Sequence, residues 1–236
     1  MNHHHPTLNP PATEPPSSWP MIRALAGIGI LCSLLIVSTW QLTLPTITKK
    51  KNEYLEKAIY QVLPGATSKK TFKITPDGKV EQLEGEERGV QRVFAGYDDQ
   101  GRLVGLAIEA RGQGFQDVLK ILYGFSPEKQ AIIGMRVLES KETPGLGDKI
   151  EKDPDFLANF KELDVSLDEN AQIRNPIVPV KHGTKANPWE IDSITGATIS
   201  SKAVANILRE NTLRLIPVVM KNLQTFEDGS LAGNGP

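Results

Sequence analysis

The stretch D-S-I-T-G-A-T-I-S-S-K (192–202) concentrates residue types that can hold a phosphate or be bonded to one. Thr195 and Thr198 supply hydroxyls, and Gly196 and Ala197 between them keep side-chain bulk away from an incoming group. The residues that follow have helical periodicity, so a helix is expected to begin here. Unpaired N–H groups and the positive end of the helix dipole favour a phosphate at such a point. The composition therefore predicts a phosphate-binding or phosphate-bonding loop.

Helix capping is a simpler role for the same stretch. Ser200 or Ser201 could accept a hydrogen bond from the first N–H groups of a helix predicted over 201–215. Capping alone does not account for the T-G-A-T run upstream of the two serines. On the residues alone, both roles stay open.

A second candidate stretch, E-T-P-G-L-G (142–147), follows a strand-like run that ends at Leu138. Pro144 suits position i+1 of a type II turn, and Gly145 suits position i+2, where φ is positive. Gly147 would let the backbone approach a flat ligand closely. A tight turn with no ligand is the alternative.

Other candidate stretches carry weaker signals. The run R-G-Q-G-F-Q-D (111–117) has two of the three glycines of a dinucleotide fingerprint, but Asp117 stands in the third position and no βαβ context precedes it. His182 lies in V-K-H-G-T-K and is expected to be solvated. His3–His5 precede a proline-rich stretch, and we interpret them as a tag remnant or chance, so no metal site is predicted.

Composition excludes several classes of function. The formal net charge of -1 does not favour a polyanionic partner such as nucleic acid. The single cysteine, Cys32, excludes an internal disulfide and any cluster held by several thiolates. The chain contains neither G-x-x-x-x-G-K-[ST] nor G-x-S-x-G. Redox chemistry would therefore need a cofactor that does not depend on cysteine ligands.

An uncharged run from Ala24 to Leu44 predicts a membrane span. At about 1.5 Å per residue it reaches roughly 30 Å, the thickness of a hydrocarbon core. Trp19 and Trp40 suit the two interfaces. The preceding residues lack the positive charge of a signal peptide, which favours an uncleaved anchor. The lysines at 49–51 would place the C-terminal part in the cytoplasm, although long domains often translocate regardless of such charges.

The rest of the chain predicts an α+β fold in which helices flank an antiparallel-rich sheet. Asp77-Gly78 predicts a short hairpin within 67–89, and residues 170–190 are expected to be mostly loop. The expected helices cover 52–63, 153–160 and 201–215, and the expected strands cover 90–97, 103–110, 121–123 and 131–138. The predicted parts are a disordered tail (1–21), a transmembrane helix (22–45), a connecting helix (46–66), one ligand-binding domain (67–220) and a C-terminal tail (221–236).

The two motifs together resemble a known family. D-S-I-T-G-A-T is similar to the flavinylation motif D-x-x-[ST]-G-A-T of FMN-binding domains, and E-T-P-G-L-G is similar to its companion motif. Their order after a single span resembles the G subunit of Rnf-type electron-transport complexes. The C subunit of the sodium-translocating NADH:quinone reductase is the close relative. One departure is that Ser140-Lys141 stand where a histidine is expected in many relatives.

The resemblance implies a covalent cofactor. Thr198 would carry FMN through a phosphoester, attached by a separate flavin transferase that uses FAD. The ring would lie against the E-T-P-G-L-G loop, with apolar contact from Leu146 and hydrogen bonds from Thr143, and Lys202 would offset the phosphate charge. The other residues implied to bind the cofactor are Asp192, Thr195, Gly196, Ala197, Glu142, Gly145 and Gly147.

The resemblance also implies a setting. The protein would be a single-pass subunit of a bacterial inner membrane. It would relay electrons in a complex that couples ferredoxin/NAD electron transfer to Na⁺ or H⁺ translocation, together with other membrane and soluble subunits. Its C-terminal domain would be periplasmic, where the flavin transferase acts. The alternative is a structural or ligand-sensing membrane subunit that binds a phosphate ligand reversibly.

Overall fold

The computed structural model describes residues 18–85, 87 and 89–229. The expectations for His3–His5 and for most of the predicted N-terminal tail lie outside these residues. The chain divides into two compact units, Met1–Lys51 and Asn52–Pro236. Each is described below by itself.

The first unit is built on helix α1 (Trp19–Val62), which continues into the second unit. Its apolar side chains are exposed along the N-terminal part, and the helix is long and apolar enough to cross a membrane. The predicted transmembrane and connecting helices are one continuous element that passes through Pro45. The helix also begins at Trp19, inside the segment that we assigned to the tail. The predicted boundaries at 21/22 and 45/46 are therefore corrected. An apolar stretch and a polar stretch can belong to one helix when only its C-terminal end is packed.

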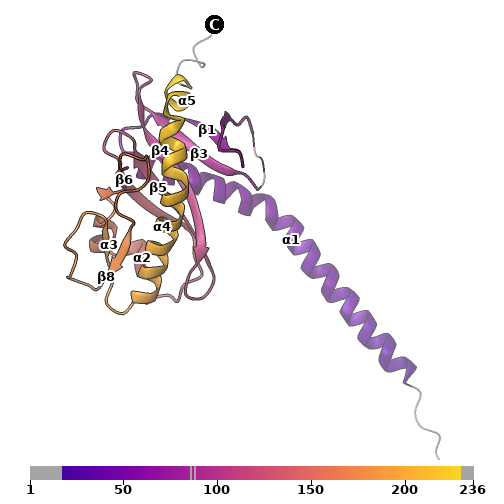
Figure 1. The fold of residues 1–236 in the computed structure, drawn as a ribbon. Helices are drawn as coiled ribbons and strands as arrows, with labels where there is room; N and C mark the ends of the chain where they lie inside the picture. The colour runs from indigo at the N-terminus through magenta and orange to yellow at the C-terminus, as the bar shows by residue number, and fades with distance from the viewer. Residues whose placement is uncertain (1–17, 86, 88, 230–236) are drawn as a thin grey trace, which may run out of the picture. The chain divides into compact units, whose positions relative to one another are not determined.

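The second unit contains an antiparallel sheet of seven strands in the order β2-β1-β3-β4-β5-β6-β7 (Figure 1). Strands that are consecutive in sequence are adjacent in the sheet, except that β3 pairs with β1 and not with β2. The hairpin expected within 67–89 forms from β1 and β2. The strands are β1 (Ser68–Ile74), β2 (Val80–Gln82), β3 (Gln91–Tyr97), β4 (Leu103–Gln113), β5 (Val118–Ser126), β6 (Ala131–Glu139) and β7 (Leu163–Asp164).

The helices pack on the two faces of this sheet. Alternate residues of a strand point to opposite faces, so Ile108 and Tyr123 face one core while Ala107 and Leu122 face the other. The first core lies under the long helix α4 (Thr198–Lys221), and the second lies under the C-terminal end of α1. Short helices α2 (Lys149–Lys152) and α3 (Pro154–Ala158) and a parallel pair of strands, β8 (Val178–Val180) and β9 (Glu190–Asp192), complete the domain.

Glycine in the sheet sets how closely α1 can pack. A Cβ atom on Gly124 would lie 2.0 Å from the carbonyl oxygen of Val62, and one on Gly134 would lie 2.9 Å from its Cα. No side chain fits at either distance. The C-terminal end of α1 therefore rests directly on the backbone of β5 and β6.

The α+β class is confirmed, and the C-terminal boundary is corrected. Residues that we assigned to a tail form helix α5 (Leu223–Asp228). Phe226 is fully buried and packs edge-to-face on Phe72, with ring centroids 5.0 Å apart, while the hydroxyl of Tyr97 donates to the Phe226 carbonyl. A single aromatic residue in a polar segment secures this end of the chain to the core.

Candidate functional site

The T-G-A-T run forms a tight turn that leads into α4. The amide of Ala197 donates to the carbonyl of Ile194 at 3.1 Å, and Gly196 between them has φ +84°. That backbone conformation favours glycine. The turn starts α4 at Thr198, earlier than the helix expected from 201. Thr198 is exposed, and its Oγ1 lies 3.4 Å from the Ile194 carbonyl.

Helix capping does not explain the serines. The N-cap residue of α4 is Ala197, which offers no side-chain cap. Ser201 is buried; its hydroxyl donates to the Ala197 carbonyl at 2.9 Å and accepts from the amide of Ile194 at 3.1 Å. Ser200 is also buried and turns to Glu142. The capping alternative is therefore wrong, and no side-chain cap occupies the first N–H groups of α4.

Glu142 connects three separate segments. Its side chain is buried, and its Oε1 accepts from the amide of Phe115 at 2.8 Å, in the loop between β4 and β5. Its Oε2 accepts from the hydroxyl of Ser200 in the first turn of α4. Because both carboxylate oxygens are engaged inside the protein, Glu142 positions these segments, and its predicted contact with a ring stays a prediction.

Two glycines leave room for this carboxylate. A Cβ on Gly147 would lie 2.6 Å from Oε2 of Glu142 and 2.9 Å from the hydroxyl of Ser200. A Cβ on Gly114 would lie 2.6 Å from Oε1 of Glu142. Gly147 thus allows close packing of a side chain inside the protein, whereas the sequence suggested close approach of a flat ligand.

The E-T-P-G-L-G loop has the predicted type II geometry. Gly145 has φ +80°, and the amide of Leu146 donates to the Thr143 carbonyl at 3.1 Å. Asp148 holds the turn by accepting from the Gly145 amide at 2.7 Å, and a hydrogen bond from Lys152 lowers the pKa of the Asp148 carboxyl. Leu146 stays exposed at the tip of the turn.

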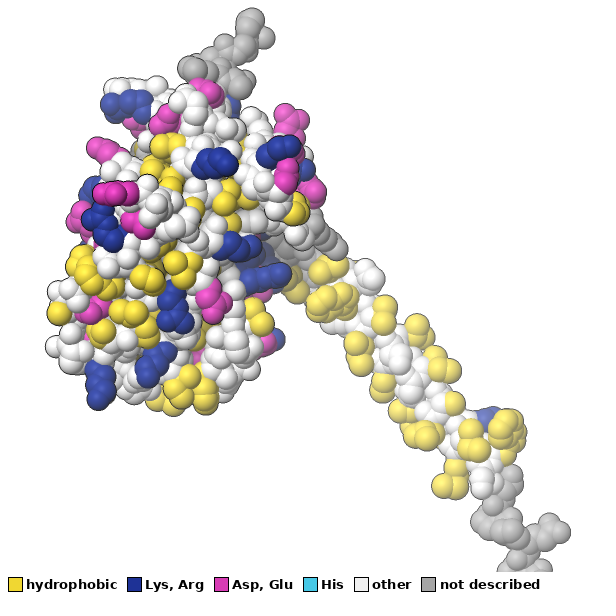
Figure 2. Space-filling model, in the orientation of Figure 1, with side chains coloured by type: hydrophobic (Ala, Val, Ile, Leu, Met, Phe, Trp, Pro, Cys, Tyr) yellow, Lys and Arg dark blue, Asp and Glu magenta, His cyan; other side chains and the backbone are white. Residues whose placement is uncertain are grey.

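Exposed apolar side chains surround the Glu142 contacts. Phe115, Leu146 and Ile199 are 57%, 54% and 59% exposed. Phe115 donates its own amide to Glu142, Leu146 precedes Gly147, and Ile199 precedes Ser200. Figure 2 shows hydrophobic side chains at the end of the domain where α4 begins in Figure 1. An apolar surface therefore adjoins the exposed Thr198 hydroxyl.

Asp192 has a structural role beside the turn. Its carboxylate accepts from the amide of Gly183 at 2.8 Å and lies 3.5 Å from Nδ1 of His182, whose side chain is 59% exposed. The amide of Asp192 donates to Asn159, and the Asn159 side chain donates back to the Asp192 carbonyl. Lys185 also donates to Asn159, and burial lowers the pKa of its ammonium group. The motif is thereby joined to the end of α3.

Comparison with known proteins identifies this part of the chain. The FMN-binding domain model matches residues 114–211, which include both motifs and the loop that bonds to Glu142. Residues 114–211 are therefore similar to an FMN-binding domain. The predicted wider extent, 67–220, stays a prediction.

Two curated relatives of this chain have the same name. The G subunit of the ion-translocating oxidoreductase complex of Methanosarcina acetivorans is 28% identical over 80% of this chain and 89% of its own length. The protein of the same name from Pasteurella multocida is 27% identical over 81% of this chain and 90% of its own. The resemblance to the Rnf G subunit is confirmed.

Solved structures share the fold of this FMN-binding domain. The crystal structure of Shewanella oneidensis NqrC aligns with a TM-score of 0.54 at 20% identity, over 78% of this chain and 100% of the other. The C subunit of the Na⁺-translocating NADH-quinone reductase from Parabacteroides distasonis aligns with a TM-score of 0.53 at 21% identity, over 76% and 95%. The antiparallel-rich architecture is therefore that of NqrC.

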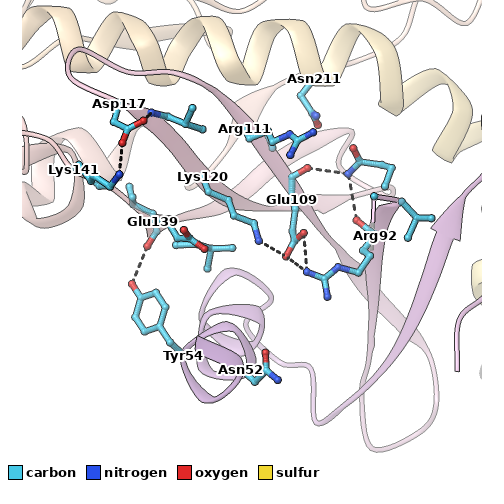
Figure 3. Close-up of a pocket in the computed structure, with 18 of the residues that line it drawn as sticks. Asn52, Tyr54, Arg92, Glu109, Arg111, Asp117, Lys120, Glu139, Lys141 and Asn211 are labelled. Atoms are coloured by element: carbon cyan, nitrogen blue, oxygen red, sulfur yellow. Dashed lines mark hydrogen bonds and ion pairs between the residues drawn. The ribbon is translucent and has the colours of Figure 1, made fainter. Parts of the chain in front are cut away.

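A groove of about 1210 Å³ reaches the residues just before the E-T-P-G-L-G motif, Ser140 and Lys141 (Figure 3). Glu109 in its wall pairs with Arg92 at 2.9 Å and with Lys120 at 3.4 Å, and Tyr54 donates to the Val137 carbonyl at 2.9 Å. None of the residues predicted to bind the cofactor lines this groove. We therefore place the candidate site at the start of α4 and not here.

The remaining predicted residues differ in their surroundings. Thr195 is exposed next to Gly196, and Thr143 accepts a hydrogen bond from the Gln116 side chain at 2.8 Å. Lys202 is exposed on α4 and makes no ion pair with the described residues.

The sequence interpretation missed Ser200 and Gln116 as members of the site. The closely spaced glycines of R-G-Q-G-F-Q were a sequence signal for Gln116, because they mark the loop between β4 and β5 that bonds to Glu142. That loop connects two antiparallel strands and is not a nucleotide-binding turn.

Proposed function

We propose that FMN is covalently attached to Thr198 through a phosphoester. The observation that carries this proposal is the exposed Thr198 hydroxyl at the first residue of a helix whose initial N–H groups have no side-chain cap. A phosphodiester there would receive hydrogen bonds and the positive end of the α4 dipole. Gly196 and Ala197 leave the approach open, as the flavinylation motif requires.

Attachment needs a second enzyme. The Oγ of Thr198 would attack the FMN phosphorus of FAD, forming the P–O bond to Thr198 and breaking the pyrophosphate bond, so that AMP leaves. The hydroxyl proton would pass to a base on the flavin transferase. A base on the transferase is needed because, among the described residues, the Thr198 hydroxyl hydrogen-bonds only to the Ile194 carbonyl, which is not a base.

The exposed apolar side chains suit the flavin ring. Leu146 offers a contact surface at the tip of the type II turn, and Gly145 allows that turn. Thr143 accepts from Gln116, which leaves its own hydroxyl proton free to donate. Lys202, an exposed cation on α4, would oppose the phosphate charge. The bound flavin supplies the redox chemistry, and the protein positions it and adjusts its potential.

We further propose that the protein relays electrons in an Rnf-type complex that couples ferredoxin/NAD electron transfer to Na⁺ or H⁺ translocation. The names of the curated relatives support this setting, and so does the helix that meets the length and composition of a membrane span. The other membrane and soluble subunits would supply the electron donor and acceptor. The FMN-binding domain would lie on the periplasmic side of a bacterial inner membrane.

A gel experiment tests the covalent bond. We expect the full chain, coexpressed with a flavin transferase and denatured, to give a fluorescent band and a tryptic peptide that carries the mass of FMN on Thr198. Thr198→Val should abolish both signals. Thr225→Val is the control, because it removes an exposed hydroxyl that lies outside both motifs and should keep both signals.

Reversible phosphate binding is the competing function. It would give a dark band for the wild-type chain, together with saturable binding of FMN that is lost on dialysis. Fluorescence that persists in Thr198→Val would instead move the attachment to another residue. Either result would overturn the proposal for Thr198.

Membrane orientation has its own test. Cysteine introduced at Lys202 in a Cys32→Ser background should react with an impermeant maleimide in intact spheroplasts. Reaction only after lysis would place the FMN-binding domain in the cytoplasm, as the lysines at 49–51 suggest.

A further inference from the structure

Phe115 is an exposed aromatic residue at the tip of the hairpin between β4 and β5. The amide of Gly114 donates to the carbonyl of Asp117 at 2.9 Å, so Phe115 and Gln116 are the two central residues of a tight turn. A single exposed apolar residue is ordinary on a protein surface. Phe115 differs because its turn is held in place and because it lies among other exposed apolar residues.

Hydrogen bonds fasten this turn to the E-T-P-G-L-G loop. Oε1 of Glu142 accepts from the amide of Phe115 at 2.8 Å and from the amide of Gln116 at 3.3 Å. The side chain of Gln116 also donates to the hydroxyl of Thr143 at 2.8 Å. Hydrogen bonds from amides to a carboxylate are stronger than those between neutral groups. The backbone of Phe115 is therefore fixed against the neighbouring loop.

The same carboxylate also holds the start of α4. Its Oε2 accepts from the hydroxyl of Ser200, which follows Thr198 by two residues. The backbone comes close on both sides, because a Cβ on Gly114 would lie 2.6 Å from Oε1 and a Cβ on Gly147 would lie 2.6 Å from Oε2. The hairpin turn, the E-T-P-G-L-G loop and the first turn of α4 therefore keep fixed positions around Glu142.

Each of these three segments presents one exposed apolar residue beside the carboxylate. They are Phe115 in the hairpin turn, Leu146 in the E-T-P-G-L-G loop and Ile199 in α4, and each is more than half exposed. Exposed apolar residues gathered at one place indicate a binding surface. Phe115 is the aromatic member of the three, and flat conjugated ligands stack on aromatic side chains. The surface therefore suits a flat ring.

We propose that the side chain of Phe115 stacks on the isoalloxazine ring of the flavin. The assignment rests on the proposed attachment of FMN at Thr198. In FMN the ribityl chain separates the ring from the phosphate, so the ring lies against a segment other than the Thr198 turn itself. The hairpin turn is joined to the first turn of α4 through Glu142, and it presents an aromatic face. The hairpin between β4 and β5 is thus part of the cofactor site.

Ring binding to a chain that lacks the covalent bond tests the contact. In a Thr198→Val background, full-length protein in detergent is titrated with FMN and with lumiflavin, which has the ring but neither ribityl chain nor phosphate. Adding Phe115→Ala should weaken both flavins roughly 5- to 100-fold, the range for a base stacked on an aromatic side chain. This variant keeps the backbone amide that bonds to Glu142, so the turn stays in place. Leu213→Ala, at an exposed apolar residue of α4, is the control and should change neither affinity.

Each other pattern contradicts the stacking. If FMN weakens but lumiflavin does not, Phe115 contacts the ribityl chain or the phosphate. If neither flavin weakens, the exposed aromatic side chain serves a different partner. If Leu213→Ala weakens both flavins as much, the loss is not specific to Phe115.

Fluorescence of the attached flavin decides the matter where free flavins bind too weakly to measure. An excited flavin takes an electron from a tryptophan in contact with it, and its fluorescence is lost. In flavinylated chains with Thr198 intact, Phe115→Trp should remove most of the fluorescence of the folded protein, and unfolding in urea should restore it. Leu213→Trp is the control, because it places the same side chain roughly 22 Å along α4 from Thr198 at about 1.5 Å per residue. It should keep the wild-type signal.

The two proposals fail in different ways. Wild-type fluorescence in folded Phe115→Trp would overturn the stacking alone, because the denatured gel band would still show the attached flavin. A dark wild-type gel band would instead overturn the attachment at Thr198, and the lumiflavin titration would still test Phe115.

Discussion

The carboxylates of Glu142 and Asp192, one from each motif, make similar hydrogen bonds but differ in how far they are buried. Each accepts a backbone N–H group and holds a loop next to the Thr198 turn. Glu142 is 6% exposed and joins segments far apart in sequence, whereas the Asp192 side chain is 24% exposed and holds a neighbouring loop. Water can reach the Asp192 carboxylate, whereas the Glu142 carboxylate is buried. We therefore expect the same change of residue type to cost much more at Glu142.

The largest effect is expected for Glu142→Ala. It leaves the part-buried amide of Phe115 and the buried hydroxyl of Ser200 without their acceptor. Each unsatisfied group costs about 1–3 kcal/mol, so the free energy of unfolding should fall by about 3 kcal/mol. Urea unfolding of the flavin-free chain measures this fall. Glu162→Ala, at a side chain 72% exposed, is the control and should change the free energy by less than about 0.5 kcal/mol.

Gly147→Ala tests how closely the protein packs around the Glu142 carboxylate. The added Cβ would meet Oε2 of Glu142 at 2.6 Å. Overpacking of this kind costs about 1–3 kcal/mol. Glu142→Ala removes the contact with Oε2 but keeps those with the Glu142 Cβ at 2.8 Å and the Ser200 hydroxyl at 2.9 Å. The loss in the double variant Gly147→Ala/Glu142→Ala should therefore be smaller than the sum of the single losses, by the part due to Oε2. Additive losses would mean that the clash is with the Glu142 Cβ and the Ser200 hydroxyl and not with Oε2.

Gly196→Ala tests the turn in the Asp192 region. Gly196 has φ +84°, and a Cβ there meets no atom within 4 Å, so the cost is one of backbone conformation alone. A loss of about 1–2 kcal/mol is expected. The extent of flavinylation should fall as well, because the turn presents Thr198. Wild-type flavinylation at an unchanged rate would show that the transferase tolerates a different turn.

Asp192→Ala should have the smallest effect on stability. It removes the acceptor of the Gly183 amide, which water can replace, so a loss of about 1 kcal/mol is expected. Limited proteolysis should show faster cleavage of the loop that contains His182 and Gly183. A loss as large as that of Glu142→Ala would remove the distinction between the two carboxylates.

Local features of the chain were predictable because their causes are local. The type II turn of E-T-P-G-L-G follows from Pro144 and Gly145, and the order of strands and helices follows from periodicity. Capping by Ser200 or Ser201 was a wrong prediction because it used the sequence next to the helix. Ser200 instead bonds to a carboxylate 58 residues away in the chain. The predicted tail is corrected where residues 223–228 form α5, which buries Phe226 in the core.

The sequence by itself determined the apolar helix, the α+β class, and the pair of motifs that identify an FMN-binding domain. Those features depend on composition, spacing and short-range backbone geometry. Only the tertiary structure decided the roles of the side chains. It buried Glu142 between the loop after β4 and the first turn of α4, and it left the Thr198 hydroxyl exposed. Burial and hydrogen bonding between distant segments have no local pattern, because they depend on how the sheet brings those segments together.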